Sequence, residues 1–445
     1  MFHKTLIASG IALMLAVPLH AAAADGRDLE IDQLKQRVQA LEALVQQLAA
    51  ALPAPAVAAA PTPPPAPPPL ASANSGNAFN PKISLILDGS YADYRRPAAE
   101  GIPGFLLGEE TGPRAEGLAL GETELAIEAN IDHSFHGWAT LAVGAEGDIG
   151  VEEAYINTLA LPHGLALKFG RFFSDIGYQN HQHAHAWEFV DAPLVYTALL
   201  GTQLGDDGLQ LRWLAPTDLF LELGAEALRG ASFPAGGDER PGIKAYTGFV
   251  HLGGDVGTGG SWRLGLSHLR ADADDRRSGE ASETGFSGSS HLSILDAVYK
   301  WAPDGNAATT NFVAQAEYFY RREHGALVHD PEGSADFSNY RGSQQGFYVQ
   351  GVYQFLPRWR VGARYDRLSA SNRLDNPVAG TSLEQLAADG DDPRRYSLMA
   401  DFSNSEFSRL RLQLNRDQSR PDGQSDDQVL VQYIFSLGSH PAHQF

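Results

Sequence analysis

Three histidines at alternate positions form the most chemically distinctive pattern in the sequence. His181, His183 and His185 are followed closely by Glu188 and Asp191. In an extended chain, alternate residues share one face and lie about 7 Å apart. Neutral imidazoles grouped in this way suit Zn, Cu or Ni. The spacing therefore predicts a candidate zinc site built on His181, His183 and His185.

Strand spacing alone rarely brings three ligands onto one ion, so other residues must contribute to such a site. His440 and His443 near the C-terminus are candidates. The alternative interpretation is a polar loop whose histidines line water. No cofactor is required by either interpretation.

Charged side chains that alternate with apolar residues form a second candidate site. If they face a water-filled lumen, acidic and basic walls oppose each other and create a transverse field that orders polar solutes. The alternative is ordinary charge pairing between neighbouring strands. The predicted pore-lining residues are Glu122, Glu124 and Glu128 early in the chain, and Arg358, Arg360, Arg364, Arg409 and Arg411 late in it.

Composition and motifs argue against several classes of protein. The 445 residues carry a formal net charge of −21, which disfavours nucleic acid as a partner. There is no cysteine, so disulfides and thiolate metal sites are excluded. The sequence has no Gly-x-Ser-x-Gly, His-Glu-x-x-His or P-loop motif. We therefore predict a protein that is not an enzyme.

The N-terminal region divides into three predicted segments. Residues 1–24 have a short basic start, an apolar run and a small-residue end, which is typical of a signal peptide. Residues 25–52 repeat apolar positions at heptad spacing, which predicts a coiled-coil helix in the periplasm, the alternative being a lone amphipathic helix. Residues 53–79 are rich in Pro and Ala and form a linker. The heptads, with the barrel, predict a homo-oligomer, with a trimer favoured.

Residues 80–445 show a period of two, which predicts an all-β transmembrane barrel. Between Gly121 and Asp132, apolar residues fall on one face and acidic or amide residues fall on the other. About 16 such segments occur, as a single-chain antiparallel barrel requires. They centre near residues 88, 126, 142, 155, 169, 211, 223, 248, 266, 296, 316, 351, 363, 399, 412 and 432.

The connections between these segments alternate in length. Short turns fall at residues 161–164, 215–217 and 356–357, and long polar loops fall at 95–118, 271–289, 323–343 and 370–393. Short periplasmic turns and long external loops are typical of Gram-negative outer-membrane barrels. The predicted partner surface is therefore outer-membrane lipid. A soluble β-sandwich is the rival fold.

The stretch from Leu167 to Gly177, which contains Gly170-Arg171-Phe172, resembles the phosphate-selective porin O and P family. The resemblance implies a 16-stranded barrel in which a loop after this motif folds towards the pore. The stretches Asn80–Asp88 and Trp213–Phe220 are similar to a proteobacterial subgroup sometimes labelled zinc-regulated or TonB-dependent outer-membrane receptors.

Two departures limit what this resemblance implies. A phosphate-selective pore is lined by basic residues, whereas this chain has 54 acidic and 33 basic residues. A TonB-dependent receptor needs a plug domain and a barrel of about 22 strands. Residues 25–80 cannot form such a plug, so interaction with TonB is doubtful.

Together these patterns predict a porin-like channel for passive diffusion of small hydrophilic solutes or ions. One alternative is a metal-linked uptake protein that uses the segment from His181 to His185. Another is a structural anchor in the outer membrane with a periplasmic coiled-coil spacer. The last strand is expected to stop near Leu437.

Overall fold

The computed structural model describes residues 81–97, 101–108, 111–144, 147–237, 242–278, 284–379, 381–387 and 392–438. The predicted signal peptide, coiled coil and linker lie outside the described residues, as do His440 and His443. No helix among the described residues is both long and apolar enough to span a membrane.

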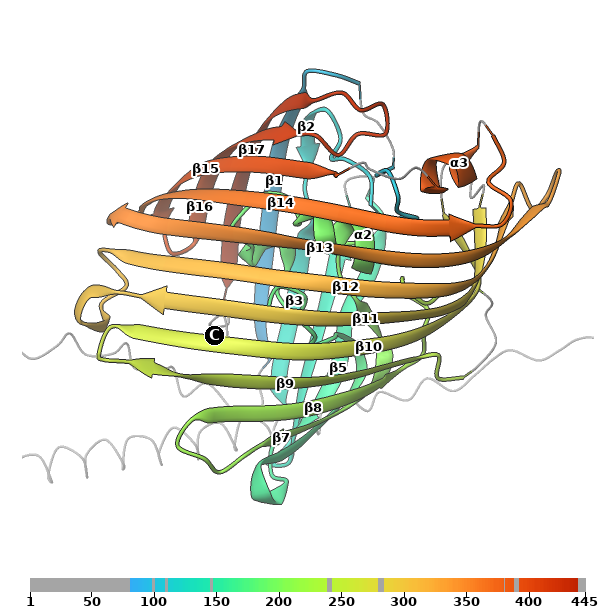
Figure 1. Cartoon of the computed structure of the whole chain (residues 1–445). Helices are drawn as coiled ribbons and strands as arrows, with labels where there is room; N and C mark the ends of the chain where they lie inside the picture. Colours follow the sequence, from blue (N-terminus) through green and yellow to red (C-terminus); the bar gives the residue numbers. More distant parts are fainter. Residues whose placement is uncertain are drawn as a thin grey trace, which may run out of the picture. The chain divides into compact units, whose positions relative to one another are not determined.

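Antiparallel strands dominate the described chain (Figure 1). Short helices are η1 (Pro162–Gly164), η2 (Ala184–Ala186), α2 (Leu194–Leu200), η4 (Pro303–Gly305) and α3 (Ser382–Ala387). The strands are β1 (Lys82–Tyr94), β2 (Gly117–Leu120), β3 (Thr123–Asn130), β4 (Phe135–Val143), β5 (Ile149–Thr158), β6 (Leu165–Phe173), β7 (Gly205–Leu214), β8 (Phe220–Leu228), β9 (Ala245–Val256), β10 (Gly260–Ser278), β11 (Thr284–Trp301), β12 (Asn311–His329), β13 (Asp336–Leu356), β14 (Trp359–Leu374), β15 (Arg394–Ser405), β16 (Ser408–Asp417) and β17 (Asp426–Gly438).

The sheet closes on itself because β1 pairs with β17 as well as with β2 and β3. β2 and β3 occupy one position in the barrel, since both pair with β1, with a register shift of one residue between the Gly89–Leu120 and Ile86–Glu124 pairs. The seventeen strands of the described residues therefore make a closed 16-position antiparallel barrel. This confirms the predicted fold class, and every predicted centre lies inside an observed strand.

Alternation along the strands explains why the barrel forms. On β16, Leu410, Leu412 and Leu414 are each 45–47% exposed on the outer face, whereas Arg411 and Gln413 are buried inside. An apolar exterior around a polar interior is the pattern of a barrel surrounded by lipid. It reverses the arrangement of a soluble β-sandwich, whose core is apolar.

Two predicted long loops are wrong in extent. β10 continues to Ser278 and β11 starts at Thr284, while β12 continues to His329 and β13 starts at Asp336. Polar sequence in these stretches predicts loops, but backbone pairing needs only a neighbouring strand. β10 to β13 therefore extend well beyond the apolar band of the wall. The last strand ends at Gly438, one residue beyond the predicted Leu437.

Candidate functional site

The connection from β6 to β7 folds into the barrel, and we call residues 174–204 the lumen segment. Its two ends meet, because the Ser174 N–H donates to the Leu204 carbonyl at 2.9 Å. The fully buried Asn180 holds these two ends together at a point that we call the neck. Its side-chain amide donates to the Ser174 and Leu204 carbonyls, and its side-chain oxygen accepts a hydrogen bond from the Leu204 N–H. The segment therefore leaves and re-enters the wall at one point, between the fifth and sixth barrel positions.

Gly170 in β6 shows why the strand before the neck has its Gly-Arg-Phe sequence. Its φ is +125°, and a Cβ there would lie 2.2 Å from the Ala154 carbonyl oxygen of β5. Only glycine tolerates both conditions. Phe172, two residues later, is fully buried in the apolar cluster inside the barrel.

Helix α2 anchors the apolar half of the lumen segment. Val195 and Leu199 are fully buried, and the helix packs against β12, β13 and β14 (Figure 1). Its first N–H, from Leu194, donates to Asp366 Oδ1 of β14 at 3.0 Å. Gly201 ends the helix in a left-handed conformation, with φ +62°. Apolar packing thus fills one side of an otherwise polar lumen.

Asp191 anchors the lumen segment by charge. Burial opposes its ionisation, but the neighbouring arginines hold the pKa of the Asp191 carboxyl well below its usual range. It accepts hydrogen bonds from Arg364 (2.6 Å), Arg395 (2.8 Å), Gln413 (2.7 Å) and Asn415 (3.0 Å). These donors come from three adjacent strands, so one carboxylate ties the segment to β14, β15 and β16.

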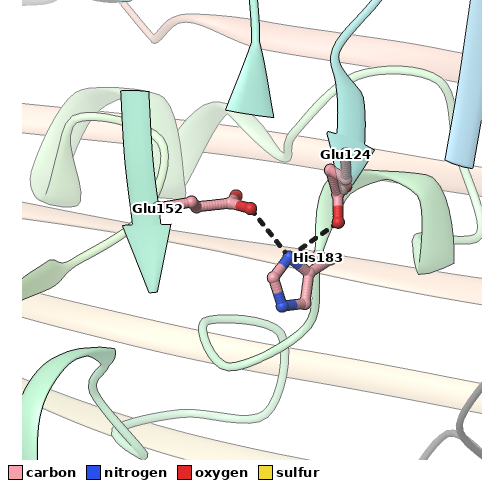
Figure 2. Close-up of side chains that lie close together, drawn as sticks. All are labelled: Glu124, Glu152 and His183. Carbon is pink, nitrogen blue, oxygen red and sulfur yellow. Dashed lines mark hydrogen bonds and ion pairs between the residues drawn. The ribbon is translucent and has the colours of Figure 1, made fainter. Parts of the chain in front are cut away.

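Elsewhere on the lumen segment, His183 lies among carboxylates of β3 and β5 (Figure 2). Its Nδ1 is 3.1 Å from Glu124 Oε2 and 3.0 Å from Glu152 Oε2, and its Nε2 is 3.0 Å from Glu153 Oε2. His185 Nδ1 lies 2.7 Å from the other oxygen of Glu124. We call these five residues the histidine–carboxylate cluster.

The cluster is well shielded from solvent. The Glu124 side chain is 3% exposed, and that of His183 is 15% exposed. Burial disfavours the imidazolium, but the surrounding carboxylates outweigh burial and raise the pKa of His183 well above its ordinary value. The local field therefore strongly favours positive charge at His183.

A β-bulge explains how two consecutive glutamates reach the same imidazole. Thr140 of β4 pairs with Glu153, and Leu141 pairs with Val151, so Glu152 is the extra residue. In a regular strand, neighbouring side chains point to opposite faces. The bulge turns both Glu152 and Glu153 into the lumen.

The structure brings together only part of the predicted histidine site. His183 and His185 share Glu124, and their rings stack with centroids 5.7 Å apart. His181 lies elsewhere, edge-on to Tyr178, and burial lowers its pKa to about 4. The segment does not have the expected strand spacing, because His181 lies in a turn closed by the Gln182 N–H and the Gln179 carbonyl, and η2 begins at Ala184.

The two acidic residues after the histidines bind arginines. Glu188 Oε2 lies 2.8 Å from Arg360 Nη1, and Asp191 pairs with Arg364 at 2.6 Å.

The predicted pore-lining charges occupy several environments. Glu124, Glu128, Arg360 and Arg409 line one cavity of the lumen, and Glu122 lines another. Arg364 and Arg411 are buried. Arg358 is a correction: it lies in the exposed turn between β13 and β14 with φ +72°. The alternation that begins at Trp359 does not extend back through that turn.

Pairing between neighbouring strands accounts for much of this charge. Arg360 of β14 pairs with Asp401 of β15 at 2.6 Å, and Arg411 of β16 approaches the same carboxylate at 3.7 Å. Glu128 of β3 pairs with Lys82 of β1 at 2.8 Å. The transverse field, with Glu122, Glu124 and Glu128 on the acidic wall and arginines on the basic wall, remains a prediction.

Two cavities lie inside the barrel, one on each side of the histidine–carboxylate cluster. The turn-side cavity, of about 1240 Å³, reaches the short turn at residues 257–259 and includes Glu124 and His183 in its lining. The loop-side cavity, of about 1480 Å³, reaches residues 101–108 and includes Glu152. No residue lines both cavities. The lumen segment and the cluster form the partition between them.

Sequence patterns gave little sign of some of these residues. Glu152 and Glu153 were not predicted, because a strict alternation of faces places consecutive residues on opposite sides and does not reveal a bulge. Asn180 was also missed, since its role depends on the two ends of a 31-residue connection meeting. The consecutive glutamates between apolar residues were the one available signal.

The fold and the lumen segment define the class: a closed antiparallel β-barrel of 16 positions with its fifth connection folded inside. No family model matches the chain. It is 32% identical over 401 residues to an uncharacterized protein of Aquifex aeolicus (strain VF5), covering 83% of this chain and 81% of that protein. The chain belongs to the same family as the Aquifex protein.

A solved outer-membrane protein shares the fold at low sequence identity. OmpTdeltaL8, a loop L8 deletion mutant of an outer membrane protein of Vibrio cholerae, superposes with a TM-score of 0.50 at 12% identity, covering 81% of this chain and 100% of that one. The outer membrane channel DcaP of Acinetobacter baumannii gives a TM-score of 0.46 at 15% identity, covering 81% and 97%.

Proposed function

We propose that this protein is an outer-membrane channel through which small hydrophilic solutes or ions diffuse passively. The observation that carries the proposal is the pair of cavities inside a closed barrel, on either side of a partition lined by charged side chains. Barrels of 16 to 18 strands are wide enough to enclose an aqueous channel. The lumen segment would then set the size and charge of the passage.

The exterior supports a membrane location. Leucines and aromatic residues are exposed along the outer faces of the strands, among them Leu264, Leu295, Leu412 and Tyr433. Exposed apolar surface of this extent is costly in water and favourable in hydrocarbon. The shared fold with a Vibrio cholerae outer membrane protein agrees with that location. A homo-oligomer, with a trimer favoured, remains our expectation.

Planar-bilayer recording tests the channel. Purified full-length protein should produce discrete conductance steps, because each barrel that inserts adds one water-filled path for ions across the bilayer. Protein unfolded by heat before addition is the control and should be silent. A folded protein that inserts but gives no steps would contradict the proposal and favour the structural-anchor alternative.

A further inference from the structure

The first inference concerns the histidine–carboxylate cluster and starts from the orientation of His183. The Phe173 N–H donates to Glu153 Oε1 at 3.0 Å, and Glu153 Oε2 lies 3.0 Å from His183 Nε2. A carboxylate in that position makes Nε2 the protonated nitrogen, as it does for many metal-binding histidines. Nδ1 then points at oxygens of Glu124 and Glu152.

With a proton on Nε2 alone, the Nδ1 lone pair would face two carboxylate oxygens at 3.0–3.1 Å and be repelled, so Nδ1 must carry a proton or a metal ion. Glu124, Glu152 and Glu153 have His183 and His185 as ion-pair partners. Even with both imidazoles protonated, three carboxylates leave the cluster negative. A divalent ion in place of the Nδ1 proton reduces that charge.

The bulge at Glu152 is an independent feature of the same place. It aims a second glutamate at Nδ1, while Glu153 remains on Nε2. Bulges often redirect side chains next to functional sites. The donor atoms of Glu124, Glu152 and His183 all lie within 4.8 Å of one another (Figure 2).

We propose that Glu124, Glu152 and His183 bind a divalent transition-metal ion of the zinc type. Zinc accepts mixed nitrogen and oxygen ligands at about 2.0–2.2 Å, so small side-chain movements bring the three donors onto one ion. Glu153 orients His183 as a positioning residue, and His185 does the same for Glu124. The three ligands leave room for water or a solute ligand.

Metal binding would tie the lumen segment to β3 and β5 at the partition, and this consequence rests on the proposed channel. His183 belongs to the segment, whereas Glu124 and Glu152 belong to the wall. An ion shared between them restricts movement of the segment away from that wall. Bound zinc should therefore lower conductance.

Equilibrium dialysis of purified full-length protein with Zn²⁺ tests the site. His183→Ala and Glu152→Gln should each weaken binding about 10-fold or more, since even second-shell changes at metal sites cost about 10–100-fold. His181→Ala is the matched control, because it removes an imidazole two residues away and outside the cluster. Co²⁺ absorption spectra give a second readout, and its ligand-field bands should disappear in His183→Ala.

Unchanged Zn²⁺ binding in both cluster variants would overturn the site, as would an equal loss in His181→Ala. Heat-modifiable mobility on gels checks that each variant is folded. Conductance is recorded separately with and without Zn²⁺. Loss of the channel with intact Zn²⁺ binding would reject the proposed function and leave the site standing.

A second inference, independent of the first, concerns the outer face of β10 to β12. Three cross-strand rows follow one another towards the long loops. The first row is apolar: Leu266, Leu295 and Tyr318 are register partners. Two residues further along, the partners are His268, Ser293 and Tyr320, and two residues beyond these they are Arg270, His291 and Arg322.

The third row places basic side chains directly opposite one another on an exposed face. Like charges directly opposite one another destabilise a sheet, so the row favours an anion. Asp272, two residues further along β10, approaches Arg270 at 3.7 Å, but both side chains are about half exposed, so this ion pair contributes little. His324 and Arg341, also register partners, continue the basic surface onto β13. The row lies four residues, or about 13 Å, beyond the apolar row, which is where lipid headgroups follow hydrocarbon.

We propose that Arg270, His291 and Arg322 bind the phosphate of a phosphorylated lipid headgroup, with the acyl chains against Leu266, Leu295 and Tyr318. Guanidinium groups suit phosphate because they donate two parallel hydrogen bonds. The inference rests on the membrane location in the proposed function. It concerns the outer wall and is independent of whether the lumen conducts.

Reconstitution in phosphatidylcholine vesicles that contain lipopolysaccharide tests this surface. The double variant Arg270→Gln/Arg322→Gln should bind lipopolysaccharide with about 30-fold lower affinity, measured by the lipid retained after purification. Each arginine near a charged lipid surface contributes roughly fivefold to the binding constant. Arg416→Gln is the control, because Arg416 is also an outward arginine with a carboxylate partner, Asp427 at 3.0 Å, but it lies on β16, outside the row.

Equal retention of dephosphorylated lipopolysaccharide by the native protein would overturn the phosphate site. So would a double variant that keeps its lipid and instead loses its oligomeric state, which would make the row a contact between subunits. Free inorganic phosphate should not displace the bound lipid, because the acyl contacts are absent from it.

Discussion

Excision of residues 175–203, with Ser174 joined to Leu204 through Asn-Gly, should raise single-channel conductance several-fold. The two junction residues already form a hydrogen-bonded pair that extends the β6–β7 hairpin. A two-residue Asn-Gly turn suits such a pair. Removal of the partition joins the turn-side and loop-side cavities into one aqueous path.

The closed wall should survive this excision, because β6 and β7 keep their own register. Deletion of residues 331–334 is the control, since that exposed turn joins β12 and β13 away from the lumen. The control should leave conductance unchanged. An excised protein that folds, by its heat-modifiable mobility, yet conducts like the native protein would show that the lumen segment does not limit the passage.

Replacement of Asp191 by Asn should lower the free energy of unfolding by about 3 kcal/mol. The substitution removes the anion shared by Arg364 and Arg395, both of which lie inside the barrel. Each guanidinium retains another carboxylate, Asp366 or Asp417, so the expected loss is at the low end for a broken buried pair. Urea unfolding followed by tryptophan fluorescence measures it.

The effect should also depend on pH. Arg364 and Arg395 lower the pKa of Asp191 in the folded state in spite of its burial. Its stabilising contribution is then complete above the ordinary carboxyl pKa of about 3.9 and is lost as pH falls through the lower folded value. The difference between native and Asp191→Asn proteins should therefore be constant at neutral pH and shrink in acid.

Asp427→Asn provides the control for this experiment. Asp427 pairs with Arg416 and Arg95 but is 46% exposed, so its loss should cost less than about 1 kcal/mol. Equal effects of the two substitutions would mean that Asp191 does not anchor the lumen segment.

The strands could be predicted from sequence because lipid and water impose opposite demands on alternate residues. On β16, Leu412 and Arg411 satisfy those demands one residue apart. The lengths of the strands were harder to predict, because β12 continues to His329 after its outer face becomes polar. The inward course of residues 174–204 was suggested by a family resemblance, whereas no local pattern indicated the neck at Asn180.

Only part of the candidate site could be predicted from the sequence. His183 and His185 stood out by their spacing, but the same spacing also included His181, which the structure places against Tyr178. The carboxylates that complete the cluster come from β3 and β5, which lie about 30 to 60 residues earlier in the chain. Their convergence depends on strand order, on the bulge at Glu152 and on a loop that crosses the lumen, and none of these is a local property.

Closure of the wall by β1 and β17 has a consequence for how the protein is made. Ser84 pairs with Gly438, so the first and last strands become neighbours only after almost the whole barrel sequence has been synthesised. Until then both strands have unpaired backbone groups, which hydrocarbon does not tolerate. Biogenesis therefore requires the nascent barrel to be kept away from lipid, or guided into it, until β1 and β17 can pair.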